Sequence, residues 1–218
     1  MPGARDGAIN YTQLRDCYGD VYLTENKVNR VRIGLSKVPF GWDNMQSSSN
    51  RIPLDRSDPI NSAINGERGT GVFYYWTPEF AQDLYKEVLD EGLKGSGNYG
   101  VFGIGADNGQ GVSRAEANDN MHFVIRLELP WKMPSGVFFP FLRWQQYTGG
   151  FLWERNSPDT FTNSFDMGVE WQIQPQMEFT MEYDFANRTN TGADAQIVDA
   201  NYAQFRGDLL RFQFQMNY

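Results

Sequence analysis

The stretch that decides the fold runs from Ser164 to Asn187 and reads SFDMGVEWQIQPQMEFTMEYDFAN. Large apolar residues alternate with polar ones along it, and Pro175 separates its two halves. Successive side chains of a β-strand point to opposite faces of the sheet, so each half predicts a strand with one apolar and one polar face. Proline has no N–H for a sheet ladder and suits a tight connection, which predicts a hairpin. The apolar row consists of Phe165, Met167, Val169, Trp171, Ile173, Met177, Phe179, Met181, Tyr183 and Phe185.

The alternation leaves open which face of these strands is the inside. In a soluble barrel or sandwich, the apolar row forms the core and the acidic row faces the surrounding water. In a transmembrane β-barrel, the apolar row faces lipid and the acidic row lines a water-filled lumen. The spacing of the residues is the same in both cases, so composition and loop lengths have to separate them.

Composition favours the transmembrane barrel. Of the 218 residues 15% are aromatic, yet the mean hydropathy is -0.56. Half-polar strands with girdles of aromatic residues produce this combination. No apolar run reaches the roughly 18 residues of a spanning helix. A net charge of -8 opposes binding to nucleic acid, and the single cysteine, Cys17, cannot form an internal disulfide.

The connections between strands fall into two classes by length. Counted backwards from the C-terminus they alternate between long and short, and only one helical connector breaks the alternation. Tight turns on one side and extended loops on the other are typical of bacterial outer-membrane barrels. We therefore expect an all-β fold, an antiparallel transmembrane β-barrel of the porin type, with about nine strands and one short connector helix. The expected strands are 17–24, 29–36, 69–76, 98–106, 120–129, 136–147, 164–174, 177–187 and 206–218.

Three connecting segments have features of their own. Residues 77–95 are expected to form a short helical connector on the barrel rim, because Thr77 can cap a helix and Pro78 suits its first position. Residues 37–68 form a long irregular stretch, and compact domains rarely keep such a loop without a function. The glycines of residues 95–111 are explained better by close packing or a bulge in a strand than by nucleotide binding.

The N-terminal residues predict that part of the barrel is missing from this chain. Residues 1–10 have neither the basic nor the apolar region of a signal peptide. Complete bacterial barrels have an even number of strands, and counting back from a last strand that runs to the periplasm places the start of the chain on the outer side. We therefore expect residues 1–218 to be a single porin domain that lacks its N-terminal strands.

A family resemblance becomes visible in residues 31–76, which read VRIGLSKVPFGWDNMQSSSNRIPLDRSDPINSAINGERGTGVFYYW. The matching features are Lys37, Pro39, Phe40 and Gly41 at a strand end, Asp43 in an acidic turn, the polar run 46–49, then Asp55 and Arg56, and finally Glu67 and Arg68. With these features the chain resembles the phosphate-selective porin O and P family, and KGSGNYGVFGIGADNGQG at residues 94–111 is similar to it as well. The resemblance implies a homotrimeric, sixteen-stranded channel in the outer membrane of a Gram-negative bacterium, of which this chain is roughly the last nine strands.

The resemblance also implies that residues 37–68 fold into the barrel as a constriction loop that contacts anions. A guanidinium offers a fork of donors to phosphate or carboxylate, and rings of charged side chains decide which ions pass a pore. The candidate substrate-binding residues are Lys37, Arg51, Arg56 and Arg68 in the loop, and Arg30, Arg32 and Arg126 on polar rows of strands.

Two features keep the ion preference open. Asp55, Asp58 and Glu67 stand beside the loop cations, so these cations can instead be held in salt bridges within the loop. The polar row of the 164–187 hairpin is acidic, as at Glu170, whereas a phosphate channel should present a positive path. A general or weakly selective channel fits the same residues.

The expected function is passive diffusion of small hydrophilic solutes, with anions such as phosphate among them, through a channel surrounded by outer-membrane lipid. No cofactor, metal or nucleic acid is expected, since no CxxC, HExxH or phosphate-binding glycine loop is present. An outer-membrane β-barrel hydrolase and a soluble ligand-binding β-barrel remain as alternatives. A hydrolase would have to use His122, the only histidine, which no catalytic motif surrounds.

Overall fold

The computed structural model describes residues 14–45, 65–91, 97–109, 111, 121–129, 137–150, 159–174, 177–191 and 204–216. There the chain forms two antiparallel sheets whose strands pair in the order of the sequence. The first sheet contains β1 (Cys17–Tyr22), β2 (Asn29–Lys37), β3 (Arg68–Trp76), β4 (Phe102–Asp107) and β5 (His122–Leu127). The second contains β6 (Val137–Gly150), β7 (Asp159–Gln174), β8 (Met177–Thr191) and β9 (Gln204–Met216). The expected antiparallel all-β fold is confirmed.

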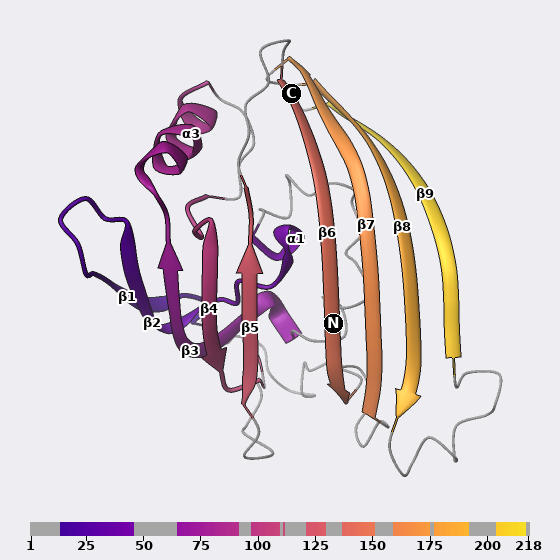
Figure 1. Cartoon of the computed structure of the whole chain (residues 1–218), viewed down its shortest axis with the longest axis horizontal. Coiled ribbons are helices and arrows are strands. Elements are labelled where there is room, and N and C mark those ends of the chain that lie inside the picture. Colours follow the sequence, from indigo (N-terminus) through magenta and orange to yellow (C-terminus); the bar gives the residue numbers. More distant parts are fainter. Residues whose placement is uncertain are drawn as a thin grey trace, which may run out of the picture.

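The two sheets stand next to each other, and the long strands β6–β9 curve in one direction (Figure 1). Ladder hydrogen bonds join neighbouring strands within each sheet, and in the described residues no ladder joins β5 to β6. The sheets nevertheless touch, because the ring of Tyr147 on β6 lies 6.0 Å from that of His122 on β5, measured between centroids. The described strands therefore form two adjoining walls rather than a closed ring.

Three strand boundaries differ by four residues or more from those expected from the alternation. β4 begins at Phe102 rather than at residue 98, because the Asn98 side chain accepts hydrogen bonds from the Thr77 hydroxyl and the Gly100 N–H and so belongs to a turn. β7 and β8 continue to Asp159 and Thr191, where cross-strand pairing runs on through polar residues. Alternation of apolar and polar residues is weak in that region, which explains why it predicts a shorter hairpin.

Three short helical elements lie in the described connections, namely α1 (Gly41–Met45), η1 (Asn65–Glu67) and α3 (Glu79–Asp90). Helix α3 follows β3 inside the segment 77–95, but its N-cap is Pro78 and not Thr77. The Thr77 N–H donates to the Val28 carbonyl oxygen and its hydroxyl to Asn98, so Thr77 still belongs to the end of the sheet. Among the described helices, none combines the length and the apolar character that crossing a membrane requires.

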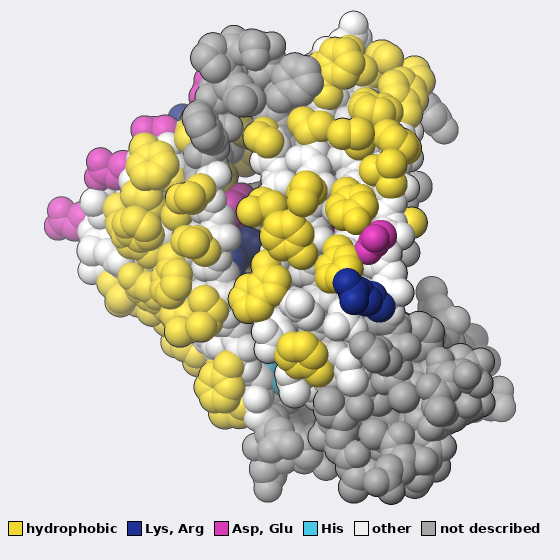
Figure 2. Space-filling model, turned by 45° about the vertical axis from the view of Figure 1, so that its right-hand side comes forward, with side chains coloured by type: hydrophobic (Ala, Val, Ile, Leu, Met, Phe, Trp, Pro, Cys, Tyr) yellow, Lys and Arg dark blue, Asp and Glu magenta, His cyan; other side chains and the backbone are white. Residues whose placement is uncertain are grey.

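Burial along the strands is the reverse of that in a water-soluble protein. Large apolar side chains point outward, and Phe123, Leu142 and Phe212 are 82%, 70% and 62% exposed. Figure 2 shows hydrophobic side chains spread over the outward surfaces of both sheets. The polar and charged side chains buried on β5–β8 are Arg126, Arg143, Gln145, Thr160, Thr162, Ser164, Asp166, Glu170, Gln172, Glu178, Thr180, Glu182 and Asp184. This arrangement contradicts a soluble barrel with its apolar rows inside.

The hairpin of β7 and β8 shows the same orientation residue by residue. Met167, Trp171 and Met181 of the apolar row are exposed on the outward face. Asp166 and Glu170 of the acidic row are buried on the inner face. The structure therefore assigns the two rows that the alternation alone leaves undecided.

A small apolar cluster lies on the inner face of the first sheet. It consists of Val38, Phe73, Tyr75 and Val124, with Phe40, Tyr99 and Tyr147 packed against it. The rings of Phe73 and Tyr75 fit because the residues paired with them on β4 are Gly105 and Gly103. A Cβ atom on Gly105 would lie 2.5 Å from the Val72 carbonyl oxygen and 2.9 Å from Phe73 Cα. Close packing thus explains glycine at this position, as expected from the sequence.

Candidate functional site on the inner faces of the sheets

Two arginines of β2 form the centre of a polar cluster on the first sheet. Arg30 and Arg32 are two residues apart, so both point inward, and both are buried. The strand register places Asp20 of β1 opposite Arg32. The Asp20 carboxylate accepts hydrogen bonds from Arg32 Nε and Nη2 at 2.7 and 2.8 Å, and it lies 3.5 Å from Arg30 Nη1. One carboxylate therefore serves two guanidinium groups, which leaves the three groups with a net positive charge.

Tyrosine rings surround these two guanidinium groups. Arg32 Cζ lies 3.7 Å from the ring centroid of Tyr18 and 5.6 Å from that of Tyr99, while Arg30 Cζ lies 4.8 Å from that of Tyr75. Cation–π attraction holds both side chains in fixed positions on the wall. Burial raises the pKa of Tyr99, although the nearby Arg32 lowers it, so the Tyr99 hydroxyl remains protonated at neutral pH.

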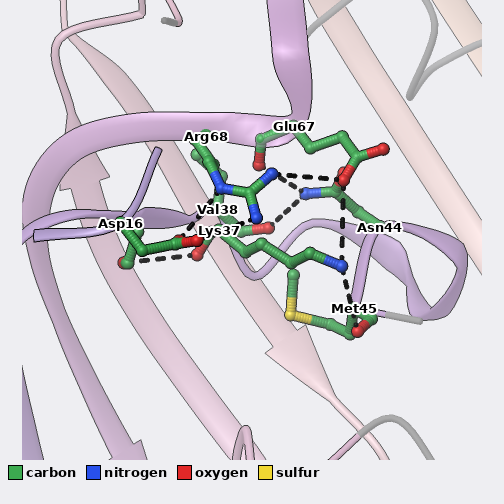
Figure 3. A network of polar contacts seen from close by, with 8 residues as sticks. Asp16, Lys37, Val38, Asn44, Met45, Glu67 and Arg68 are labelled. Carbon is green, nitrogen blue, oxygen red and sulfur yellow. Dashed lines mark hydrogen bonds and ion pairs between the residues drawn. The ribbon is translucent and has the colours of Figure 1, made fainter. Parts of the chain in front are cut away.

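At the far end of β2, ion pairs join the start and the end of the segment 37–68 (Figure 3). Lys37 Nζ lies 3.8 Å from the Glu67 carboxylate and donates to the Met45 carbonyl oxygen at 3.4 Å. Arg68 lies 3.5 Å from Glu67 and donates two hydrogen bonds, of 2.9 and 3.0 Å, to Asp16. Glu67 thus bridges one cation from each end of the segment.

Asn44 joins the same two ends through the backbone. Its side chain is fully buried, and Nδ2 donates to the Val38 carbonyl oxygen at 2.7 Å and to the Glu67 carbonyl oxygen at 3.1 Å. The Val38 N–H also donates to the Glu67 carbonyl oxygen at 3.1 Å. We define the neck as the set of residues held by these contacts, namely Asp16, Lys37, Val38, Asn44, Glu67 and Arg68.

Arg126 is a third buried arginine of the first sheet and lies on β5. It pairs with Glu128 two residues along the chain, and Nη1 donates to the Gly41 carbonyl oxygen at 3.1 Å. Gly41 begins α1, and Val38 just before it packs in the inner apolar cluster. Residues 38–45, the first part of the expected constriction loop, therefore lie against the inner face of the first sheet.

The second sheet carries a buried network of charges of its own. Arg143 of β6 donates from Nη2 to Glu182 at 2.7 Å, and its Nε lies 3.2 Å from the Asp166 carboxylate. Arg211 of β9 lies 3.8 Å from Glu182 and 3.9 Å from Asp184. These contacts link all four strands of the sheet across its inner face.

Several of these residues are missing from the set that the sequence predicts. The alternation places Arg143 on the inner face only after Leu142 and Trp144 are known to face outward. The residues before it in β6 do not alternate clearly between apolar and polar, so they do not show which face is inside. Asp20 is identified as the partner of Arg32 only by the register of β1 and β2. No local signal identifies Asn44, whose partners lie 6 and 23 residues away in the sequence.

The buried charges of the two sheets differ in balance, although the first sheet also holds the buried carboxylate of Asp107 on β4 and the second the buried Arg143 on β6. Those on β2 and β5 are the arginines Arg30, Arg32 and Arg126. Those on β7 and β8, among the residues whose burial is described, are all carboxylates, namely Asp166, Glu170, Glu178, Glu182 and Asp184. One wall of the inner surface therefore carries mainly buried positive charge and the other mainly buried negative charge.

The predicted substrate-binding residues fall into three groups. Arg30, Arg32 and Arg126 are buried on the inner face of the first sheet, and Lys37 and Arg68 come together in the neck. Arg51 and Arg56 lie outside the described residues. All five described residues have a carboxylate partner, so salt bridges hold Lys37 and Arg68 in the way that the neighbouring Glu67 suggests.

His122 lies at the start of β5, where the register places it opposite Asp107. Its ring meets that of Tyr147 edge to face, with the ring planes 76° apart. In the part of the chain that the structure describes, no group of three or more His, Cys, Asp and Glu side chains is arranged to hold a metal ion. The described ring contact of His122 serves to join the two sheets.

Comparison with known proteins identifies the family of the chain that forms this inner wall. The family model described as phosphate-selective porin O and P matches residues 3–176, a range that includes β1–β7, both arginines of β2 and the neck. Comparisons with curated proteins and with solved structures gave no match. The outward apolar faces and inward charged faces of the strands agree with a porin β-barrel. The chain belongs to the phosphate-selective porin O and P family.

Proposed function

We propose that this protein forms a water-filled channel in the bacterial outer membrane, through which small hydrophilic solutes diffuse down their own gradients. The observation that carries the proposal is the reversed burial of the strands, with apolar side chains outward and charged side chains inward. Lipid solvates the outward side chains, and a polar lumen suits the inward ones. Membership of a porin family supports the same function.

The inner face of the first sheet gives the channel a preference for anions. Arg30 and Arg32 share the single carboxylate of Asp20, so positive charge remains for a passing anion. A guanidinium binds phosphate and carboxylate oxygens through paired donors. The carboxylates of β7 and β8 oppose this preference, because they make the adjoining wall mainly negative. We therefore expect a modest anion preference, with phosphate among the anions that pass.

Residues 37–68 are the part of the chain that we propose narrows the channel. Val38 belongs to the inner apolar cluster, and the Gly41 carbonyl oxygen accepts a hydrogen bond from Arg126 on the inner face. The neck holds both ends of the segment at one place on the wall, beside Lys37 and Arg68. Arg51 and Arg56 stay candidate anion contacts from the sequence.

We propose that the outward faces of the two sheets contact lipid and neighbouring copies of the chain. Side chains such as Phe123, Ile125 and Leu142 are exposed there and suit the hydrocarbon of outer-membrane lipid. Neighbouring copies in a homotrimer, the assembly expected for this family, would cover part of the same surface. Lipid and two further copies of the chain are therefore the proposed partners.

Single-channel recordings in planar lipid bilayers test the channel directly. The full-length protein should give stepwise conductance, and its reversal potential in a KCl gradient should have the sign of an anion preference. Inorganic phosphate should reduce the chloride current if both ions use the arginine cluster. Absence of conductance would refute the channel, whereas a cation preference would refute the anion proposal and leave the channel intact.

The contribution of the arginine cluster has its own test in Arg32→Gln. Removal of this charge should lower the ratio of anion to cation permeability by about two- to five-fold, as expected for one unit charge at contact distance in water-like surroundings. Arg206→Gln is the matched control, because Arg206 lies exposed beside Phe185 on the outward face of β9. Equal reversal potentials for the two variants would show that the β2 arginines do not select ions.

A further inference from the structure

We infer that Glu67 is a specificity-determining residue of the channel, because its carboxylate lies at ion-pair distance from Lys37 and Arg68 and competes there with a passing anion. The inference rests on the proposed channel function and assigns a residue that limits the anion preference. Lys37 Nζ and Arg68 Nη1 lie 3.8 and 3.5 Å from the same atom, Glu67 Oε2 (Figure 3). Two cations from separate strands thus converge on one carboxylate oxygen.

The backbone at Glu67 adopts a conformation that residues other than glycine rarely take. Its φ is 71°, as is that of Gly66 before it. A side chain with a Cβ is strained in this left-handed region, and the strain persists only where surrounding contacts impose it. Here the Glu67 carbonyl oxygen accepts hydrogen bonds from the Val38 N–H and Asn44 Nδ2, each 3.1 Å long. The neck thereby fixes the direction in which the Glu67 side chain leaves the backbone.

The ion-pair cluster is partly accessible to solvent. The side chains of Lys37, Glu67 and Arg68 are 15%, 16% and 12% exposed, whereas Asn44 is fully buried. Carboxylate and phosphate oxygens bind ammonium and guanidinium groups through the same charge-assisted hydrogen bonds. Arg68 is also held by the Asp16 carboxylate, so Glu67 competes with a permeating anion mainly for Lys37. This competition weakens anion binding and speeds anion release.

The variant Glu67→Gln tests this competition, because it removes the charge and keeps the size and backbone contacts of the residue. We expect its ratio of anion to cation permeability in a KCl gradient to exceed that of the wild type by about two- to five-fold. This is the change in ion binding expected for one unit charge at ion-pair distance. Inorganic phosphate should block its chloride current at lower concentration. Asp90→Asn removes one exposed charge at the end of α3 and should change neither quantity.

A double-mutant cycle with Lys37→Met connects the effect to this ion pair. In the wild-type background Lys37→Met should change the phosphate block of the chloride current little, because Glu67 already competes with phosphate for Lys37. In the Glu67→Gln background it should remove much of the gain in phosphate block, as expected for coupled residues. Glu67→Gly removes the same charge and also relieves the strain of the left-handed backbone, so it should show the same rise in the permeability ratio. It tests the inference even if the glutamine variant folds poorly.

The outcomes separate the inference from the channel function. If the wild type conducts and both Glu67 variants keep its reversal potential, the inference is wrong and the channel stands. An equal effect of Lys37→Met in both backgrounds also overturns the inference. If the wild type does not conduct, the channel function is wrong and the inference fails with it.

Discussion

At the scale of single residues, Gly105 shows how a neighbour across the ladder limits side-chain volume. A Cβ at this position would lie 2.5 Å from the Val72 carbonyl oxygen and 2.9 Å from Phe73 Cα, and a backbone cannot move aside as a flexible side chain can. Gly105→Ala should therefore lower the free energy of unfolding by about 1–3 kcal/mol, measured by urea titration in lipid vesicles. Gly19→Ala is the control, because nothing lies within 4 Å of a Cβ there. Equal unfolding midpoints for the two variants would contradict the packing described for β3 and β4.

At the scale of elements, the β7–β8 hairpin predicts that a charge is tolerated on one face only. Met181→Lys places an ammonium group on the outward face and should cost about 2–4 kcal/mol near the middle of the bilayer. Gln172→Lys places the same group on the inner face, where Gln172 now donates to Glu170 at 2.7 Å and stands opposite Glu178. This second variant should fold nearly as well as the wild type. The folded fraction in vesicles, read from heat-dependent gel mobility, distinguishes them, and equal losses would invalidate the orientation of the hairpin.

At the scale of the whole molecule, the outward tryptophans predict where the surface meets lipid. Trp144 and Trp171 are exposed on the outward face, and Trp144 Nε1 donates to Asn163 at 2.7 Å. Acyl chains that carry bromine should quench their fluorescence in vesicles strongly, and aqueous iodide only weakly. Trp144→Phe and Trp171→Phe should each remove part of the bromine-quenched emission. If iodide quenches the emission of these two tryptophans more strongly than bromine does, this face meets water instead.

The strands themselves could be predicted from the sequence, because a period of two is a local property. Residues 164–174 and 177–187 lie inside the observed β7 and β8, and the all-β class follows from the same pattern. The period of two could not show which face of the sheet is the inner one, because both faces repeat with the same period. Loop lengths, composition and the family resemblance supplied that information, and the exposed Met181 agrees with it.

The polar contacts of the inner wall were only partly predictable, because most of them depend on register and on distant segments. Arg30 and Arg32 could be placed on an inner face by counting, but their shared partner Asp20 depends on how β1 pairs with β2. The neighbouring Glu67 indicates a salt bridge with Arg68, since the two are adjacent in sequence. Its second partner, Lys37, is 30 residues away and meets it only because β2 and β3 are paired.

The outward row of β8 also predicts how deep the protein would sit in the proposed membrane. From Met177 to Phe185 it spans eight residue steps of about 3.4 Å, or about 27 Å along the strand and about 21 Å along the bilayer normal at the usual tilt. This thickness is close to the hydrocarbon layer of a bacterial outer membrane, about 25 Å in such barrels. On β9, Asp208 pairs with Phe185 at the C-terminal end of that row, and Arg206 follows two pairs further, opposite Asn187. In the proposed membrane orientation we therefore expect the guanidinium of Arg206 at the level of the lipid headgroups, and the part of the β7–β8 ladder toward Asp159 and Thr191 beyond the bilayer surface.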